Sequence, residues 1–182
     1  CNEFHVCVIG QVKLFALSPD GHEKVIELIG PGGTFAEALM FTGRPYVVGA
    51  QAVTDALVLS VGKDAVLAEI ARDAKFALHM LAGVSRRLHG LIRDVEAYSL
   101  HSGAQRIIGY LLRECNDEEG QGCHPVTVSL PVSKAMIASR LSLTPEYFSR
   151  VLHELEAEGL IEIDRRDIRI RQPQRLAQYQ PA

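Results

Sequence analysis

Residues 133–159 read SKAMIASRLSLTPEYFSRVLHELEAEG, and this stretch decides the fold of the C-terminal part of the chain. Ser133 and Thr144 each precede a segment of helical periodicity, and such hydroxyls cap the free backbone amides at a helix start. Pro145 follows at the first helical position, where its missing N–H is not needed. Gly159 is typical of a helix end. We therefore expect two helices joined by a short turn: Lys134–Leu141 and Pro145–Glu158, with Ser142-Leu143-Thr144 between them.

Short β-rich runs flank this pair of helices. Val126–Leu130 precedes it, and Leu160–Ile163 and Asp167–Ile170 follow it, with Arg165 and Arg166 at the turn between the last two. Two helices across a short turn, followed by a hairpin, form a winged helix-turn-helix. In that motif the second helix enters the major groove of double-stranded DNA.

The second helix has an apolar face and a polar face. The apolar face is expected to be buried and consists of Phe148, Val151, Leu152 and Leu155. The first turns expose Glu146, Tyr147, Ser149, Arg150 and His153. Arg forks onto guanine, Glu accepts a hydrogen bond from cytosine, and Ser bonds either base or phosphate. We predict that Glu146, Ser149 and Arg150 read bases; the alternative is a surface ion pair between Glu146 and Arg150.

The average charge of this region does not explain DNA binding, because residues 131–175 hold 8 Lys or Arg and 7 Asp or Glu. Only the local placement of basic and hydroxyl groups is informative, because phosphate contacts position a protein on the duplex. The candidate phosphate contacts are Ser133, Lys134, Arg140, Thr144, Tyr147, Arg165 and Arg166.

Residues 63–115 have a helical pattern, and their central part carries a heptad repeat. The apolar positions alternate by four and three residues: Ala77, Leu81, Val84, Leu88, Leu91, Val95 and Tyr98. We call these seven residues the heptad seam. A lone helix cannot bury such a seam, so a dimerisation helix is predicted. The alternative is a core helix that packs on its own β domain.

Residues 1–62 contain short β-rich runs separated by Gly and Pro turns. The expected strands are Phe4–Gly10, Gln11–Leu17, His22–Ile29, Tyr46–Val53 and Ala56–Val61, with a short helix over Phe35–Phe41. The prediction is an α+β protein in three parts: a β-roll (jelly roll) over 1–62, a helical segment with the dimerisation coiled coil over 63–101, and a winged helix-turn-helix over 102–182. Because residue 1 is Cys and a strand-like run begins at once, we expect the numbering to start inside a longer protein.

The composition of the 182 residues is that of a globular protein, with 47% hydrophobic and 23% charged residues and a net charge of −3. No apolar run reaches the roughly 18 residues that a membrane span needs. No nucleophile elbow, Walker loop or zinc-protease motif indicates an enzyme. Cys1, Cys7, Cys115 and Cys123 lack the spacing of a metal site, and we expect reduced thiols, with a bridge between Cys115 and Cys123 as the alternative.

The whole chain resembles the Crp/Fnr family of bacterial transcription regulators. Residues 33–41, GTFAEALMF, are similar to a segment of that family's cyclic-nucleotide-binding-type roll. Residues 146–150, EYFSR, match the E-x-x-S-R pattern of its Fnr-like branch. The resemblance implies a cytoplasmic homodimer without a membrane anchor, which binds TTGAT-type inverted repeats in double-stranded DNA and acts on RNA polymerase.

The resemblance also frames the effector. In the cyclic-AMP branch, Glu37 would hold the ribose and an Arg-Ser pair the phosphate, and here the pair is Arg44-Pro45. Proline has neither the hydroxyl nor the N–H, so no nucleotide is expected. Five segments are most similar to the Dnr-type, nitric-oxide-responsive regulators of denitrification: residues 21–24 (GHEK), 34–37 (TFAE), 40–41 (MF), 50–53 (AQAV) and 85–89 (SRRLH). This resemblance implies haem between the roll and the long helix. An oxygen-sensing cluster and a cyclic nucleotide are the alternatives, and the sequence names no iron ligand; His79 and His89 are expected at the surface.

Overall fold

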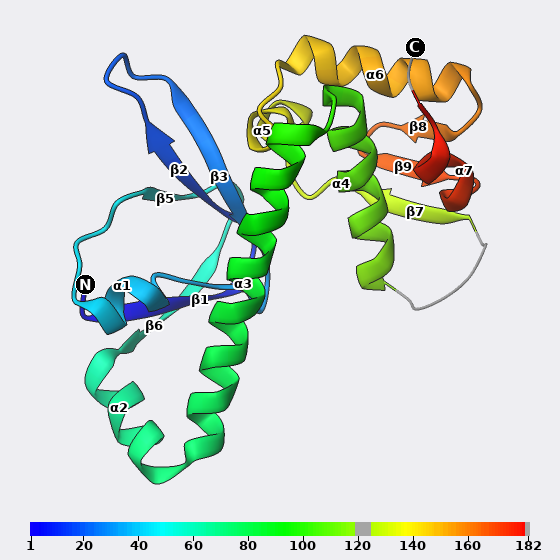
Figure 1. Ribbon diagram of the computed structural model, residues 1–182. Helices are drawn as coiled ribbons and strands as arrows, with labels where there is room; N and C mark the ends of the chain where they lie inside the picture. The colour runs from blue at the N-terminus through cyan, green and yellow to red at the C-terminus, as the bar shows by residue number, and fades with distance from the viewer. Residues whose placement is uncertain (119–124, 181–182) are drawn as a thin grey trace. The chain divides into compact units, whose positions relative to one another are not determined.

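The computed structural model describes residues 1–118 and 125–180, and its chain divides into two compact units, Cys1–Asp94 and Val95–Ala182. Figure 1 shows strands gathered in the first unit and mostly helices in the second. The boundary between the two units falls within a long helix. Each unit is described below by itself.

The first unit contains two three-stranded antiparallel sheets. One has the order β4-β1-β6 and the other the order β3-β2-β5. Their strands are β1 (Glu3–Ile9), β2 (Val12–Leu17), β3 (Glu23–Ile29), β4 (Thr34–Phe35), β5 (Gly49–Ala52) and β6 (Leu57–Gly62). This arrangement, together with the winged helix-turn-helix described below, confirms the predicted α+β fold with a β-roll, a long helix and a C-terminal winged helix-turn-helix.

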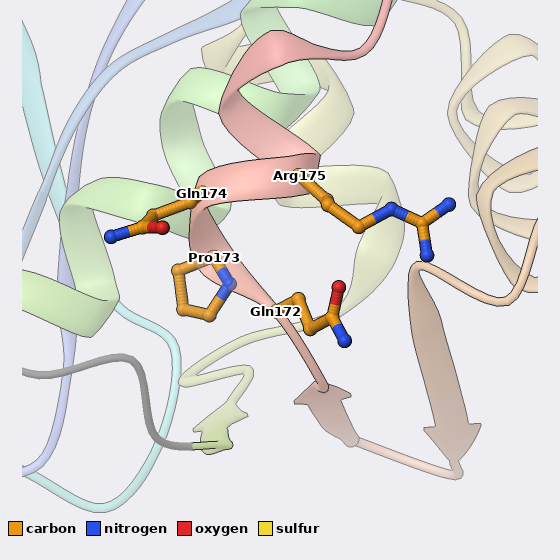
Figure 2. Close-up of a pocket in the computed structure, with 4 residues that line it drawn as sticks. All are labelled: Gln172, Pro173, Gln174 and Arg175. Carbon is orange, nitrogen blue, oxygen red and sulfur yellow. The ribbon is translucent and has the colours of Figure 1, made fainter.

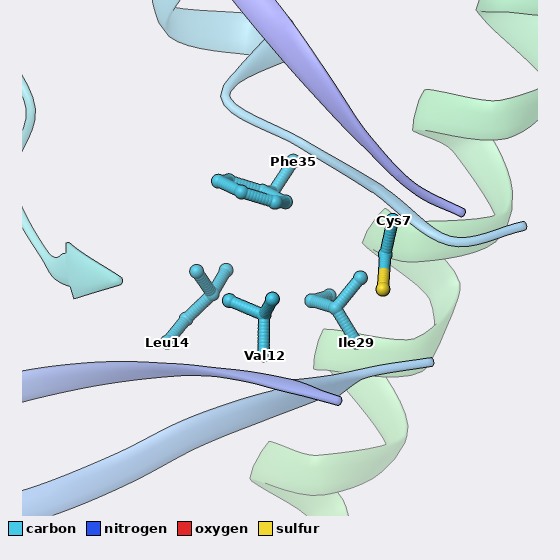
Figure 3. Close-up of a cluster of buried hydrophobic side chains, with 5 residues drawn as sticks. All are labelled: Cys7, Val12, Leu14, Ile29 and Phe35. Carbon is cyan, nitrogen blue, oxygen red and sulfur yellow. The ribbon is translucent and has the colours of Figure 1, made fainter. Parts of the chain in front are cut away.

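Two apolar clusters hold this unit together. Figure 3 shows the first, in which both sheets contribute side chains: Cys7, Val12, Leu14, Ile29 and Phe35. The second cluster joins β1 to the helices, because Phe4, Met40 and Val66 are buried against Phe76 and Met80. Its helices are α1 (Glu37–Thr42), α2 (Lys63–Arg72) and the first turns of α3 (Ala74–Leu100). The long helix is therefore anchored to the roll at its beginning.

The second unit contains a winged helix-turn-helix. Its elements are α4 (Gly103–Glu118), β7 (Val126–Ser129), α5 (Lys134–Arg140), α6 (Pro145–Ala157), β8 (Ile161–Asp164), β9 (Asp167–Ile170) and α7 (Pro173–Gln178). The strands form one antiparallel sheet with the order β7-β9-β8. The hydroxyl of Thr144 accepts a hydrogen bond from the Tyr147 amide at 3.2 Å, and Ser133 accepts one from the Met136 amide at 3.3 Å. Both predicted helix caps are confirmed.

The helical prediction over 63–115 misses two breaks. The first is at Asp73, whose carboxylate accepts a hydrogen bond from the Lys75 amide at 2.9 Å and so starts a new helix. The second is at Ser102, which exchanges two hydrogen bonds with Gln105, at 2.8 and 3.2 Å. This reciprocal pair is a capping box, the S-x-x-Q signal of a helix start. The chain therefore has three helices here where one was expected.

Smaller corrections concern the ends of elements. The helix expected over Phe35–Phe41 begins at Glu37, because Phe35 pairs with His5 in β4. Helix α4 continues to Glu118, three residues beyond the predicted helical segment, and α7 was not predicted. Cys1 and Cys7 are free thiols, whereas the side chains of Cys115 and Cys123 lie outside the described part of the chain. No helix among the described residues has the length and apolar character that a membrane span requires.

Replacing Thr144 with Ala removes the acceptor for one amide at the start of α6. We expect the free energy of unfolding to fall by about 1 kcal/mol, the usual value for a lost N-cap. Urea denaturation followed by circular dichroism measures this change, and Thr144→Ser, which keeps the hydroxyl, is the matched control. An unchanged midpoint in Thr144→Ala would contradict the capping role.

Candidate nucleic-acid interface

Helix α6 is the candidate reading helix, and its apolar stripe fixes its orientation within the second unit. Phe148, Val151, Leu152 and Leu155 are buried, as predicted. On the other side Glu146, Arg150 and His153 are exposed, while Tyr147 and Ser149 are half-buried. The predicted base-reading residues therefore lie in the first two turns, and two of the three, Glu146 and Arg150, are exposed.

The guanidinium of Arg150 has two neighbours on its own helix. It forms an ion pair with Glu154, four residues later, rather than with Glu146. Its Cζ atom also lies 4.8 Å from the ring centroid of Tyr147, three residues earlier, which is cation–π geometry. Glu154 was missed from the sequence, although the i,i+4 spacing could have indicated it. The Arg150 guanidinium therefore has Tyr147 on the N-terminal side and Glu154 on the C-terminal side of the same helix.

Tyr147, a predicted phosphate contact, packs its ring against the start of α4. A Cβ atom built on Gly103, at the start of α4, would lie 2.6 Å from Cε1 of Tyr147 and 2.9 Å from its hydroxyl. The tyrosine ring therefore covers the backbone of Gly103. Since no other residue type lacks a Cβ, this close approach depends on glycine.

The predicted phosphate contacts fall into two groups. Arg165 and Arg166 are exposed at the β8–β9 turn, and Lys134 is half-buried at the start of α5. Arg140 instead donates a hydrogen bond to the Tyr98 hydroxyl at 2.9 Å. The hydroxyl oxygens of Ser133 and Thr144 accept hydrogen bonds from backbone amides as helix caps. Each hydroxyl can still donate its hydrogen to a phosphate oxygen.

Glu156 joins α6 to the wing. Its carboxylate accepts a hydrogen bond from the Ile163 amide at 2.9 Å. This bond, with smaller contributions from His153 and Lys134, lowers the pKa of Glu156 below its usual value. A lowered pKa in the folded state means that the contribution to stability is present near neutral pH and is lost as the pH falls through that pKa.

The heptad seam is mostly uncovered in the single chain. Leu81 is 62% exposed, Leu88 is 56% exposed and Val95 is 65% exposed. The remaining members range from half-buried to exposed: Ala77, Val84, Leu91 and Tyr98. The roll is instead contacted by Phe76 and Met80, which lie outside the seam. The alternative of a core helix therefore applies to the start of α3, and the seam remains available to a partner.

A polar cleft lies where β3, α1 and α3 of the first unit meet. Its volume is about 330 Å³, and its charged lining residues are Glu27, Glu37, Arg86 and Arg87. Arg87 donates to Glu27 at 3.0 Å and to the Thr34 carbonyl at 2.7 Å, and lies 3.4 Å from Glu37. Glu37 also accepts a hydrogen bond from the Thr34 hydroxyl. The predicted effector residue Glu37 is thus contacted by the long helix through Arg87, a contact that the sequence did not predict.

Arg44, the other predicted effector residue, does not join Glu37. It is exposed and lines neither this cleft nor the apolar pocket described next. The cleft also lacks the features of a haem site, because it is charged and its lining holds no His, Cys, Met or Tyr. The expectation of haem between the roll and the long helix therefore finds no support in these residues.

The apolar pocket lies inside the roll and has a volume of about 330 Å³. Its lining residues are His5, Leu14, Phe35, Ala36, Leu39, Tyr46, Val48 and Ala50. His5 accepts or donates two hydrogen bonds, to Ser60 at 2.9 Å and to Tyr46 at 3.2 Å. The pocket is thus apolar, with one imidazole and one phenol as its polar groups. This volume is at the lower end of the range for ligand pockets.

A third hollow, of about 200 Å³, lies beside α7 and is lined by Gln172, Pro173, Gln174 and Arg175 (Figure 2). Figure 2 shows their side chains pointing in different directions, so the hollow brings no set of donors together. No group of three or more His, Cys, Asp or Glu able to hold a metal is present within 1–118 and 125–180, as far as their side chains are described. His79 and His89 are exposed, as expected.

Two family models match the chain. Residues 1–73 match the cyclic nucleotide-binding domain, and residues 105–179 match the Crp-like helix-turn-helix domain. The two matches coincide with the roll and with the winged helix-turn-helix. Long α3 lies mostly between them.

Several individual proteins are similar to this chain over nearly its whole length. The CRP-like cAMP-activated global transcriptional regulator of Mycobacterium tuberculosis is 22% identical over 97% of this chain and 79% of its own length. A Ruegeria pomeroyi protein described as a cyclic nucleotide binding protein is 31% identical, with a TM-score of 0.66 over 98% of this chain and 76% of that one. FixK2 from Bradyrhizobium japonicum shares the fold, with a TM-score of 0.84 and 24% identity over 100% of this chain and 88% of its own.

The uncovered heptad seam generates a test of self-association. We expect Leu88→Lys combined with Leu91→Lys to convert a dimer into a monomer, because two ammonium groups per chain cannot be buried unpaired. Analytical ultracentrifugation measures the mass. Leu78→Lys, at an exposed apolar position of α3 outside the seam, is the matched control. A double variant that still sediments as a dimer would refute the assignment of the interface.

Proposed function

Because this chain belongs to the Crp/Fnr family of DNA-binding transcription regulators, we propose that it is a homodimer that reads TTGAT-type inverted repeats in response to an effector. From such a site it acts on RNA polymerase at nearby promoters. A two-fold dimer presents two reading helices, and an inverted repeat has the matching symmetry.

One observation carries the proposal: the exposed face of α6. The buried stripe leaves Glu146 and Arg150 accessible in the first two turns, where a recognition helix contacts base edges. A guanidinium and a carboxylate on one face can recognise guanine and cytosine respectively. A surface ion pair between these two side chains would compete with this role, but Arg150 pairs with Glu154 instead. Glu146 therefore remains available to a base.

For the effector we propose nitric oxide sensed through haem in the apolar pocket of the roll. The pocket supplies an apolar lining together with His5 and Tyr46, and His and Tyr are both side chains that hold haem iron. Bound haem would supply an iron centre to which nitric oxide binds. His5 would hold the iron through Nε2, in place of the hydrogen bond that this nitrogen makes with the Tyr46 hydroxyl at 3.2 Å. Ser60, which contacts Nδ1 at 2.9 Å, would orient the imidazole.

A cyclic nucleotide is the alternative effector, since relatives include proteins named for cyclic AMP. Two features of the roll disfavour it here. Glu37 is engaged by Arg87 and Thr34, and Pro45 beside Arg44 offers no hydroxyl or amide donor. Micromolar binding of cyclic AMP in a calorimeter would favour this alternative over haem.

Replacing Arg150 with Ala tests the reading role. We expect a loss of about 1–3 kcal/mol per half-site on the correct sequence, and much less on random DNA, because a bidentate contact to guanine is sequence-specific. The measurement is a series of binding titrations over single-base variants of a TTGAT-N4-ATCAA duplex at fixed salt. Equal losses on every duplex would make Arg150 a phosphate contact and refute the reading role.

Lys134→Ala is the matched control for that series. A phosphate contact carries no sequence information, so all duplexes should weaken alike. The slope of log affinity against log salt should fall in magnitude by about 1 per half-site, because one fewer counterion is released. A loss of affinity that depends on the identity of one base pair would show that Lys134 contacts a base rather than a phosphate.

Absorption spectroscopy tests the effector proposal. Haem added to the protein should give a Soret band that shifts when nitric oxide is added. His5→Phe should alter the spectrum of the bound haem, because the imidazole that would hold the iron is gone, whereas the exposed His89→Phe should not. Identical spectra in the two variants would exclude His5 as the ligand.

A further inference from the structure

We propose that Tyr147 is a positioning residue for DNA reading, which acts through its ring by holding the guanidinium of Arg150 in place. The inference rests on the proposed reading role of Arg150. It replaces the expectation that the Tyr147 hydroxyl contacts a phosphate.

The ring of Tyr147 has a fixed seat. It lies over Gly103, where an added Cβ would come within 2.6 Å of Cε1 and 2.9 Å of Cζ. Gly103 is the first residue of α4, and the capping box of Ser102 and Gln105 fixes the backbone there. Because backbone rather than a flexible side chain supports the ring, its orientation does not depend on DNA.

The ring in turn limits where Arg150 can lie. An arginine that is 59% exposed on a helix surface would otherwise sample many rotamers and lose that freedom when it binds a base. Tyr147 is three residues before Arg150 and Glu154 is four residues after it, so all three share one helix face. Both the cation–π contact at 4.8 Å and the ion pair with Glu154 therefore restrict the position of the Arg150 guanidinium along this face.

The two neighbours have different consequences for DNA. Glu154 holds Arg150 through Nη1, one of the three guanidinium nitrogens that could donate to a guanine, so this ion pair competes with reading at that nitrogen. The Tyr147 ring contacts the face of the guanidinium and leaves its edge N–H groups free to donate. The ring can therefore keep its contact while Arg150 is bound to a base, and lowers the entropic cost of reading.

The test compares two changes to Tyr147 on the same set of duplexes. Tyr147→Phe keeps the ring and should leave affinity and discrimination within about twofold of the parent protein. Tyr147→Leu removes the ring. It should reduce discrimination by about 2- to 5-fold at the base pair that Arg150→Ala identifies, the size of an exposed cation–π contact. Tyr179→Leu, another half-buried tyrosine of the same unit, is the matched control.

A second variant guards against a folding defect in Tyr147→Leu. Gly103→Ala leaves Tyr147 intact but places a Cβ where the ring lies, so it should show the same selective loss. In the Arg150→Ala background, Tyr147→Leu should cause no further loss of discrimination, because coupled residues are not additive. Circular dichroism establishes that each variant is folded before it is titrated.

Two results would overturn the inference. If Tyr147→Phe weakens binding to all sequences, random DNA included, the hydroxyl contacts phosphate. If Tyr147→Leu and Gly103→Ala both leave discrimination unchanged, the ring does not position Arg150. These outcomes are distinct from a failure of the proposed function, in which Arg150→Ala itself would show no sequence dependence.

Discussion

The burial of one apolar stripe on α6 is the constraint on which the rest of the DNA-binding unit depends. Phe148, Leu152 and Leu155 have no exposed surface, and Val151 is 2% exposed. Since residues three and four apart share a helix face, burying these side chains determines which others face solvent. The same packing places Tyr147 at the edge of the stripe, where its ring reaches Gly103. Specific chemistry on the polar face thus follows from packing on the apolar face.

The sequence predicted those elements whose local signals agree with the tertiary structure. The caps at Ser133 and Thr144, the apolar stripe of α6 and the two-sheet roll were all confirmed, because capping chemistry and periodicity are local properties. The breaks at Asp73 and Ser102 were missed because the apolar pattern continues across them. Contacts between distant segments could not be predicted from the sequence. Arg87 and Glu27 are 60 residues apart, and no local signal in either segment indicates that they pair.

Glu37, which the family resemblance assigned to the effector, is engaged within the first unit itself. Arg87 and Thr34 both contact its carboxylate. Two carboxylates around one guanidinium make that cluster depend on partly shielded charges, with Arg87 26% and Glu37 12% exposed. Any anion that entered the cleft would meet Glu27 and Glu37 as well as the arginines. The apolar pocket carries no such charges, and a different kind of ligand is accordingly suited to each hollow.

Because the seam of α3 is uncovered in a single chain, the stability and the dimer content of this protein depend on its concentration. Apolar side chains that are half exposed or more in a single chain are stabilised only when another surface removes them from water. Association stabilises the folded state by mass action, so the melting temperature rises with concentration. Below the dissociation constant of such a dimer, the amount of paired protein varies with the square of the chain concentration. A modest change in synthesis or degradation would then become a steeper change in promoter occupancy, independent of any effector.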